Sequence, residues 1–295
     1  KREMSDIAQS VGVPVPRSYG PSDDLRGRTI LVKPTDRGGQ VGIRRIASAN
    51  DVDEAVAFAR QASRTGEVVV QDWLEGAEIN VVTFLGPNGE LQSVQSSRER
   101  LSHDVPIATR HHYSADARTT SRTVDAYARA LGARLVPAGG VLFSQFVIGR
   151  EGVWLVDCGV RLPGGLMHLI VLYATGVDLL GAECRWASGE TWNAQVVLEP
   201  SKCVDIRFLT SNPGPIPSGL HVEQLAWDQL AESCIRSVLA FSDRPVTRKA
   251  TDASDRYIAV VAAGNNCESV SGELAMVESS ILREVSLWGK AEVAM

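Results

Sequence analysis

Three stretches of the chain combine residue types that can bind an anion or a flat ligand. In the first, Lys33 is followed by a loop that contains Gly38, Gly39 and Gly42. Because glycine has no Cβ, the backbone N–H groups of such a loop can approach an anion closely, and a lysine at the end of the preceding strand adds positive charge. We therefore expect a phosphate-binding loop, with an ordinary glycine hairpin beside a surface lysine as the alternative.

The second stretch, residues 68–82, has two β-branched runs separated by a polar step that contains glycine. This pattern predicts a strand, a short connector and a second strand, and therefore a crease between two sheets. Trp73 and Leu74 can offer apolar surface to a flat ligand in such a crease, and Glu78 places a carboxylate where the second strand begins. A plain hairpin with one exposed acid is the alternative.

The third stretch, residues 139–165, predicts two paired strands joined by a turn at residues 149–152. Asp157 and Arg161 are four residues apart on the second strand, so they should share one face of the sheet. A carboxylate that could hold a metal ion and a guanidinium that could hold an anion would then lie together. The alternative is a hairpin with one surface ion pair.

These stretches need elements that position them, and the hydrophobic pattern predicts a mixed α/β chain. Expected strands lie at residues 30–32, 43–46, 91–96, 204–209 and 256–264. Expected helices lie at residues 1–10, 50–65, 121–132, 166–174, 178–180, 222–241 and 276–288. Residues 98–112 crowd arginines and histidines; we expect a loop that faces water, with an anion-binding surface as the alternative.

Composition excludes several classes of protein. The 295 residues are 44% hydrophobic and 22% charged with a net charge of −5, which is typical of a globular chain and offers no basic surface for nucleic acid. The five cysteines include no C-x-x-C pair, so their spacing indicates neither a disulfide framework nor a zinc site. The sequence has no apolar run long enough for a membrane helix and no signal peptide. We expect a cytoplasmic protein.

Taken in order, the three stretches resemble the ATP-grasp superfamily, and most closely its carboxylate–amine ligases, which include amino-acid and dipeptide ligases. The resemblance implies an α/β (α+β) fold in which two α/β lobes grip ATP. It implies a small lobe at residues 1–76, a large lobe at residues 77–200 and a C-terminal ligase module at residues 201–295. The N-terminal α/β domain of those ligases is not matched, and the chain begins within an expected helix, as a truncated protein would.

The resemblance also implies roles in holding ATP. Lys33 would contact the α- and β-phosphates, and Glu78 would bind the ribose hydroxyls. Lys1 falls where a further nucleotide-contacting lysine is often kept. The implied phosphate loop is Gly38, Gly39 and Gly42, and the implied adenine contacts are Gln71, Trp73 and Leu74.

At the reaction centre, the resemblance implies that Arg161 holds the acyl phosphate or tetrahedral intermediate beside the Gly164-Gly165 backbone. The family usually binds two Mg²⁺ ions through a carboxylate on the first strand and Glu-x-Asn on the second. Here the corresponding residues are Gln145, Asp157 and Gly159. Asp157 could hold one Mg²⁺ against ATP, because Mg²⁺ commonly uses one or two carboxylates together with phosphate oxygens.

The activity implied is an ATP-dependent ligase, with ATP and Mg²⁺ as cofactors. It would join a small-molecule carboxylate and an amine, with amino acids or peptides expected, into an amide through an acyl phosphate and release ADP and phosphate. No nucleic acid or membrane partner is expected, and a homodimer stays open. The alternative is a catalytically degenerate module that binds nucleotide or acts as a scaffold, because Gln145 and Gly159 depart from the metal-binding pattern.

Overall fold

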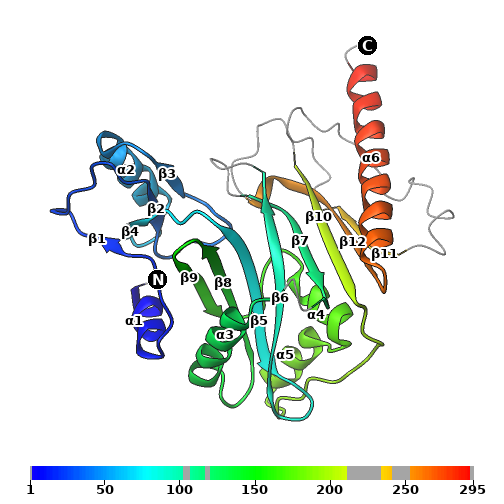
Figure 1. The fold of residues 1–295 in the computed structure, drawn as a ribbon. Helices are drawn as coiled ribbons and strands as arrows, with labels where there is room; N and C mark the ends of the chain where they lie inside the picture. The colour runs from blue at the N-terminus through cyan, green and yellow to red at the C-terminus, as the bar shows by residue number, and fades with distance from the viewer. Residues whose placement is uncertain (1, 102–106, 117–119, 211–233, 241–252, 293–295) are drawn as a thin grey trace.

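The described strands form two antiparallel sheets (Figure 1). The small sheet lies beside the edge of the large sheet that β8 (Val141–Gly149) and β9 (Gly152–Val160) form. The structure is a computed structural model that describes residues 2–101, 107–116, 120–210, 234–240 and 253–292. Lys1 therefore lies outside the described residues. The mixed α/β architecture predicted from sequence is confirmed.

The small sheet holds the first of the three stretches. In spatial order its strands are β1 (Ser18–Tyr19), β4 (Val68–Asp72), β2 (Ile30–Pro34) and β3 (Arg44–Ile46). A short 3-10 turn, η1 (Ala49–Asp51), leads into helix α2 (Val52–Ala62). Ile30 and Val32 alternate toward α2 and pack on Ala55 and Ala59, so the buried face of β2 holds the helix against the sheet.

The large sheet has eight strands. In spatial order they are β11 (Ile235–Ala240), β12 (Arg256–Gly264), β10 (Cys203–Thr210), β7 (Ala108–Ser114), β6 (Leu91–Arg100), β5 (Ala77–Leu85), β8 (Val141–Gly149) and β9 (Gly152–Val160). Strands β10 to β12 therefore continue the sheet that β5 to β9 begin. The division into domains at residue 200 stays a prediction.

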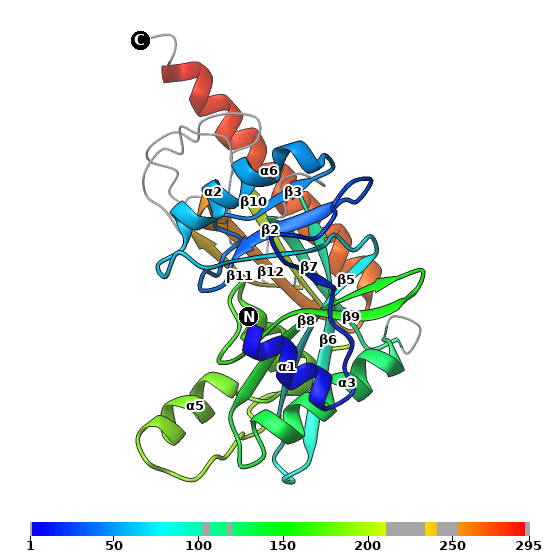
Figure 2. The ribbon, with the colours of Figure 1, turned by 90° about the vertical axis from the view of Figure 1, so that its left-hand side faces the viewer.

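Helices cover both faces of the large sheet. They are α1 (Arg2–Ser10), α3 (Arg122–Leu135), α4 (Met167–Thr175), α5 (Leu179–Ala187) and α6 (Cys267–Glu292). On β10, Ile206 and Phe208 belong to the core that α4 covers, whereas Leu209 belongs to the core under α6. Ala8 of α1 shares a third core with α3, and Figure 2 shows these two helices side by side.

Two predictions about secondary structure were wrong. In the described part of residues 98–112, which were expected to form a loop, Arg98 and Arg100 end β6, and residues 108–112 belong to β7; residues 102–106 lie outside the described residues. Pairing between these strands places alternate side chains on opposite faces, which buries some of the polar residues. The expected helix at residues 222–241 is strand β11 in its described part, and the rest lies outside the described residues.

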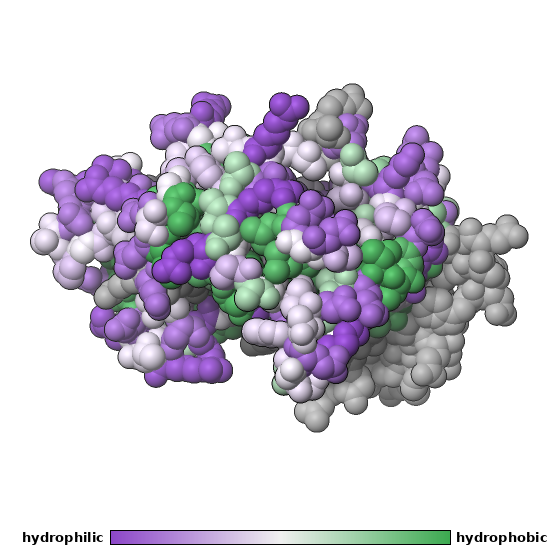
Figure 3. Space-filling view, turned by 90° about the horizontal axis from the view of Figure 1, so that it is seen from below, coloured by the Kyte–Doolittle hydropathy of each residue, from purple (hydrophilic) through white to green (hydrophobic). Residues whose placement is uncertain are grey.

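Hydrophobic side chains also reach the surface. In the view from below, they form separate groups among polar residues (Figure 3). The large exposed ones on and after α5 are Leu180, Trp186, Val196 and Val197. Among the described helices, none is both long enough and apolar enough to span a membrane.

Candidate functional site

A cavity of about 300 Å³ lies where the two sheets meet. Its lining comes from β2 and the glycine loop on one side, and from β5 to β9, the start of α4 and the segment before β12 on the other. Of the residues singled out from the sequence, it contains Lys33, Gly38, Gly39, Gln71, Trp73, Leu74, Glu78, Asp157, Arg161, Gly164 and Gly165. Residues from all three stretches thus meet in one place.

Gly42 was predicted to belong to the phosphate loop but does not line the cavity. Its φ is +75°, a conformation that side chains disfavour, and a Cβ there would lie 2.5 Å from the Ala62 Cβ and 2.9 Å from the Pro34 Cγ. Close packing between the loop and α2 therefore explains this glycine without any ligand.

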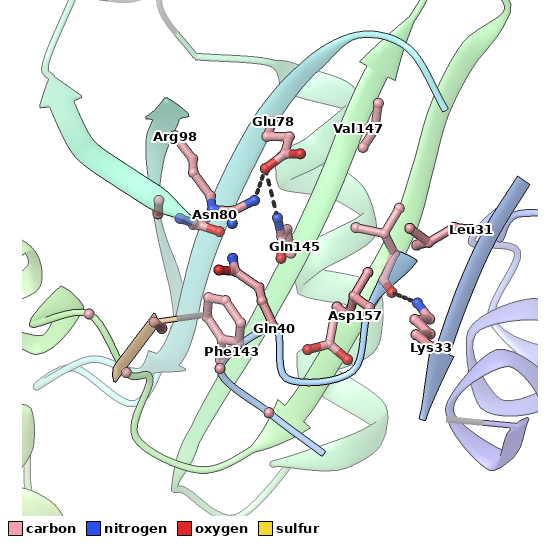
Figure 4. Close-up of a pocket in the computed structure, with 18 of the residues that line it drawn as sticks. Leu31, Lys33, Gln40, Glu78, Asn80, Arg98, Phe143, Gln145, Val147 and Asp157 are labelled. Atoms are coloured by element: carbon pink, nitrogen blue, oxygen red, sulfur yellow. Dashed lines mark hydrogen bonds and ion pairs between the residues drawn. The ribbon is translucent and has the colours of Figure 1, made fainter. Parts of the chain in front are cut away.

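One end of the cavity is apolar and carries one lysine. Leu31, Leu74 and Val147 supply the apolar lining. Lys33, only 5% exposed, donates from Nζ to the Val156 carbonyl at 2.9 Å (Figure 4). Lys33 therefore places a positive charge inside the cavity, and the apolar walls suit a flat aromatic base.

The glycine loop closes over the cavity from the small sheet. The Gly39 carbonyl accepts a hydrogen bond from the Ala253 amide at 3.0 Å, which ties the loop to the segment before β12. Gln40 has a φ of +68° and lines the cavity, and its buried Oε1 has no hydrogen-bond partner among the described residues. A buried acceptor without a partner costs about 1–3 kcal/mol, so a ligand that donates to Gln40 would be favoured.

The Trp73 ring is fixed from several sides. Its Nε1–H donates to Glu75 at 2.6 Å, and the guanidinium carbons of Arg45 and Arg100 lie 5.3 Å and 4.9 Å from the ring centre. Cations over an aromatic face are attracted to it, which holds the ring in place. Trp73 is therefore a rigid wall of the cavity.

Glu78 is the centre of a nearly buried ion-pair cluster. Figure 4 shows Arg98 and Gln145 converging on its carboxylate. Arg98 pairs with Oε2, Gln145 Nε2 donates to the same oxygen at 3.1 Å, and Arg100 Nε lies 2.9 Å from Oε1. Both carboxylate oxygens thus serve protein donors. A ligand hydroxyl would share Glu78 with these groups.

The deep end of the cavity is positively charged. Burial, together with the charges of Arg100 and Arg256, lowers the pKa of Arg98 to about 9, and burial lowers that of Arg256 to about 10, so both stay protonated at neutral pH. Burial and the two cations Arg98 and Arg256 lower the pKa of His111 to about 3. The neutral His111 ring contacts Asn80 Nδ2 through Nδ1 at 3.1 Å. This end suits an anionic ligand.

Arg161 lies at the rim, between the sheet and α4. Its guanidinium carbon is 5.3 Å from the Phe143 ring centre, and Nη1 donates to the Leu162 carbonyl at 3.1 Å. Gly165 has a φ of +65°, and a Cβ there would be 2.9 Å from His111 Nε2, so only glycine fits against this histidine. The backbone thus reaches the cavity at the N-terminus of α4, which favours negative charge.

Comparisons with known proteins agree with this geometry. Residues 26–130 match the family model described as D-ala D-ala ligase C-terminus. A D-alanine–D-alanine ligase of Fusobacterium nucleatum is 29% identical over 94 residues, which is 32% of this chain and 30% of the relative. A phosphoribosylamine–glycine ligase of Methanocella arvoryzae is 23% identical over 175 residues, which is 52% of this chain and 40% of the relative.

Solved structures extend the likeness over nearly the whole chain. The L-amino acid ligase from Bacillus licheniformis superposes with a TM-score of 0.71 at 13% identity, covering 95% of this chain and 70% of that one. A carboxyaminoimidazole ribonucleotide synthase from Aspergillus clavatus, complexed with ATP, gives 0.68 at 14% identity, covering 96% and 72%. The chain thus has the ATP-grasp fold of these ligases. It spans less than half the length of the curated relatives it matches.

Within the ATP-grasp fold, the donor set for a metal ion is thin. Asp157 and Gln145 are direct partners across β8 and β9, and both line the cavity. The Asp157 carboxylate makes no hydrogen bond or ion pair with another residue that the structure describes, and in particular none with Arg161. Gly159 offers no side chain, and the Glu78 oxygens are taken by arginines. These residues fit one Mg²⁺ ion that takes its other ligands from phosphate and water.

Several residues of the ATP-grasp cavity were not predicted as site residues. They are Gln40, Asn80, Arg98, Phe143, His111 and Arg256. The polar stretch that contains Arg98 and His111 was noted, but it was expected to be a loop. Strict alternation along two strands was the signal that could have placed Arg98 and His111 on one inner face.

Proposed function

We propose that this protein is an ATP-dependent carboxylate–amine ligase. One observation carries the proposal: the Lys33 loop and the Arg161–Gly165 turn, far apart in sequence, line the same cavity between two sheets. Names of the relatives agree with it, since the matched proteins are ligases of this kind. The activity of the whole protein remains a proposal because the chain covers only part of those relatives.

ATP would lie with its base against Leu31, Leu74 and Val147, beside Gln71 and Trp73. Glu78 would accept from the ribose hydroxyls while it keeps its arginine partners. Lys33 would turn from the Val156 carbonyl to the α- and β-phosphates, and the backbone of Gly38 and Gly39 would cover the phosphates. This arrangement brings the γ-phosphate toward the charged end of the cavity.

The reaction would have two steps. A substrate carboxylate oxygen attacks the γ-phosphorus, which breaks its bond to the β-γ bridging oxygen and gives an acyl phosphate and ADP. The amine then attacks the acyl carbon, loses a proton, and expels phosphate as the amide forms. Arg161 and the Gly164-Gly165 backbone would stabilise the negative charge that develops on the acyl oxygen, because donors fixed in place act strongly in a site that excludes water.

Mg²⁺, when bound, would neutralise phosphate charge during phosphoryl transfer. Asp157 is the residue that would hold it, with Gln145 beside it. Arg98 and Arg256 at the deep end would attract the carboxylate substrate. ATP and the substrate would share a cavity of about 300 Å³. We therefore expect small substrates, amino acids or peptides.

Free thiols at all five cysteines support a reducing, cytoplasmic location as part of the same proposal. A homodimer remains a prediction that size-exclusion chromatography with light scattering would test. The division into lobes at residues 76 and 200 likewise stays a proposal, which limited proteolysis would test at those two positions.

The direct test is phosphate release from ATP over a panel of amino-acid pairs, with mass detection of the amide product. We expect phosphate and amide in equal amounts for at least one pair. Lys33→Met should remove a phosphate counter-charge and weaken ATP binding, measured by calorimetry. Lys202→Met, at a position away from the cavity lining, is the matched control and should leave ATP binding unchanged.

Two outcomes would overturn the proposal in different ways. Unchanged ATP affinity in Lys33→Met would remove the nucleotide site from this cavity. Normal ATP binding without amide formation for any carboxylate and amine would favour the alternative, a degenerate module that binds nucleotide as a scaffold.

A further inference from the structure

A second cluster of reactive side chains lies on the face of the large sheet that α6 covers, away from the cavity. His112 of β7, Cys203 of β10 and Cys267, the first residue of α6, each offer a ligand atom, and these three atoms all lie within 4.8 Å of one another. No residue of this cluster lines the cavity. The cluster is therefore independent of the proposed ligase site.

Strand register explains why these residues meet. His112 pairs with Asp205 and Ser114 pairs with Cys203 across β7 and β10, so all four side chains point to the same face. The start of α6 packs over this face, and Cys267 Sγ lies 3.7 Å from Ser114 Oγ. Three elements from distant parts of the chain thus deliver one imidazole and two thiols.

We propose that His112, Cys203 and Cys267 bind a Zn²⁺ ion. Zinc is the common metal for mixed sulfur and nitrogen ligands at tetrahedral sites. Bonds of about 2.3 Å to sulfur and about 2.0–2.1 Å to nitrogen separate the ligand atoms of a tetrahedral site by roughly 3.3–3.8 Å. Small side-chain shifts would bring the present cluster to that spacing. A water molecule would complete the tetrahedron as the fourth ligand.

The surroundings of His112 support the assignment. Its Nδ1 is buried, has no hydrogen-bond partner among the described residues, and lies 3.7 Å from Asp205 Oδ2. Asp205 itself is completely buried and is held by Arg110, whose Nη2 donates to Oδ2 at 2.6 Å, and by Ser271. Metal-binding histidines usually donate their second ring nitrogen to a carboxylate. Asp205 is placed to accept from Nδ1, which leaves Nε2 for zinc.

Both thiols would lose a proton when zinc binds, so the site releases two protons and gains two thiolate bonds. Cys203 is completely buried, so solvent does not compete for its sulfur. The ion would join β7, β10 and α6 as a structural clip. His111, the neighbour of His112, lines the cavity on the other face, so the clip would also stabilise that wall.

Metal analysis of the full chain, purified without chelator and then supplied with Zn²⁺, tests the proposal. We expect one zinc per chain in the wild type, and a thiolate-to-metal charge-transfer band after exchange with Co²⁺. Cys267→Ser and His112→Gln should lose the bound zinc and weaken the cobalt band. Cys184→Ser is the matched control, because Cys184 is exposed and lies outside the cluster, and it should keep both.

Thermal unfolding gives a second readout. Removal of zinc with a chelator should lower the melting temperature of the wild type and of Cys184→Ser, but not that of Cys267→Ser. Cys203 is completely buried, and a serine in its place could prevent folding. Cobalt titrations of the wild type and of Cys267→Ser therefore decide whether the metal site exists. The proposal is overturned if the wild type binds neither metal, or if Cys184→Ser loses as much zinc as Cys267→Ser. A Cys203–Cys267 disulfide found by non-reducing peptide mass spectrometry would also overturn it.

Discussion

His111 and His112 are consecutive residues of one strand, yet they belong to two different sites. His111 faces the cavity, only 4% exposed, between the cations Arg98 and Arg256. His112 faces α6, beside the carboxylate of Asp205 and two thiols. One face of the large sheet therefore surrounds its histidine with positive charge, while the other offers negative charge and sulfur. The same side chain is suited to an anion site on one face and to a metal site on the other.

The largest expected effect comes from the carboxylate that anchors each face. Glu78→Gln removes the partner of Arg98 on the cavity face, and Asp205→Asn removes the partner of Arg110 on the α6 face. Glu78→Gln should lower the free energy of unfolding by about 3–5 kcal/mol, because it removes the carboxylate that pairs with the nearly buried Arg98 and Arg100. Asp205→Asn should lower it less, because Arg110 keeps its ion pair with Glu99. Urea denaturation measures this. Only Glu78→Gln should also weaken ATP binding in calorimetry; an equal loss in Asp205→Asn would mean that the two faces are not separate.

Arg161→Ala should affect catalysis on the cavity face without affecting nucleotide affinity. We expect amide formation to slow by about 10²–10³, the usual effect of removing one fixed donor to a developing charge. Arg161→Lys should recover little, because a point charge does not reproduce a bidentate guanidinium. Arg207→Ala, which breaks an ion pair with Glu278 on the α6 face, is the control and should keep the rate. A wild-type rate in Arg161→Ala would show that residues 161–165 are not the reaction centre.

Acid should affect the two faces in different pH windows. The pKa of His111 is lowered from 6.5 to about 3, so the unfolded chain takes up its proton first as pH falls, and the free energy of unfolding decreases below pH 6.5. Burial raises the pKa of Asp205, but the hydrogen bonds from Arg110 and the nearby His112 outweigh it and lower that pKa from 3.8 to about 2, so the stabilisation is lost only below pH 3.8.

His111→Gln tests this difference, with an expected effect of at most a few kcal/mol. Between pH 6.5 and pH 3.8, the variant should show a flatter dependence of unfolding free energy on pH than the wild type, measured by urea denaturation. An equal dependence of the unfolding free energy on pH in the wild type and in His111→Gln would show that His111 is not buried between Arg98 and Arg256.

The smallest expected effect concerns the ring under Arg161. Phe143→Leu removes a cation–π contact worth about 0.5–1 kcal/mol, so amide formation should slow by roughly two- to fivefold. Phe58→Leu removes a similar contact with Arg44 on the exposed surface of α2 and should leave the rate unchanged. A larger loss in Phe58→Leu than in Phe143→Leu would contradict the assigned position of Arg161.

The sequence by itself determined the mixed α/β fold and part of the cavity lining. One local pattern, a lysine followed by glycines, contains Lys33, Gly38 and Gly39. Another, a strand followed by a connector and a second strand, contains residues 71–78. Both patterns depend only on residues that are close along the chain. Local backbone preferences and hydrophobic alternation are encoded within about ten residues, so single segments reveal them. The roles of these residues in binding remain predictions.

Only the tertiary structure decided which side chains meet across strands. Register places Arg98 opposite Glu78 and pairs residues 98–100 with residues 108–111, where a loop was expected. Register likewise aligns His112 with Asp205, and the packing of α6 adds Cys267, although the cysteine spacing indicated no metal site. A shift of one residue would move each side chain to the opposite face. The energy that fixes the register comes from burial over whole sheets and helices, which no short stretch of sequence contains.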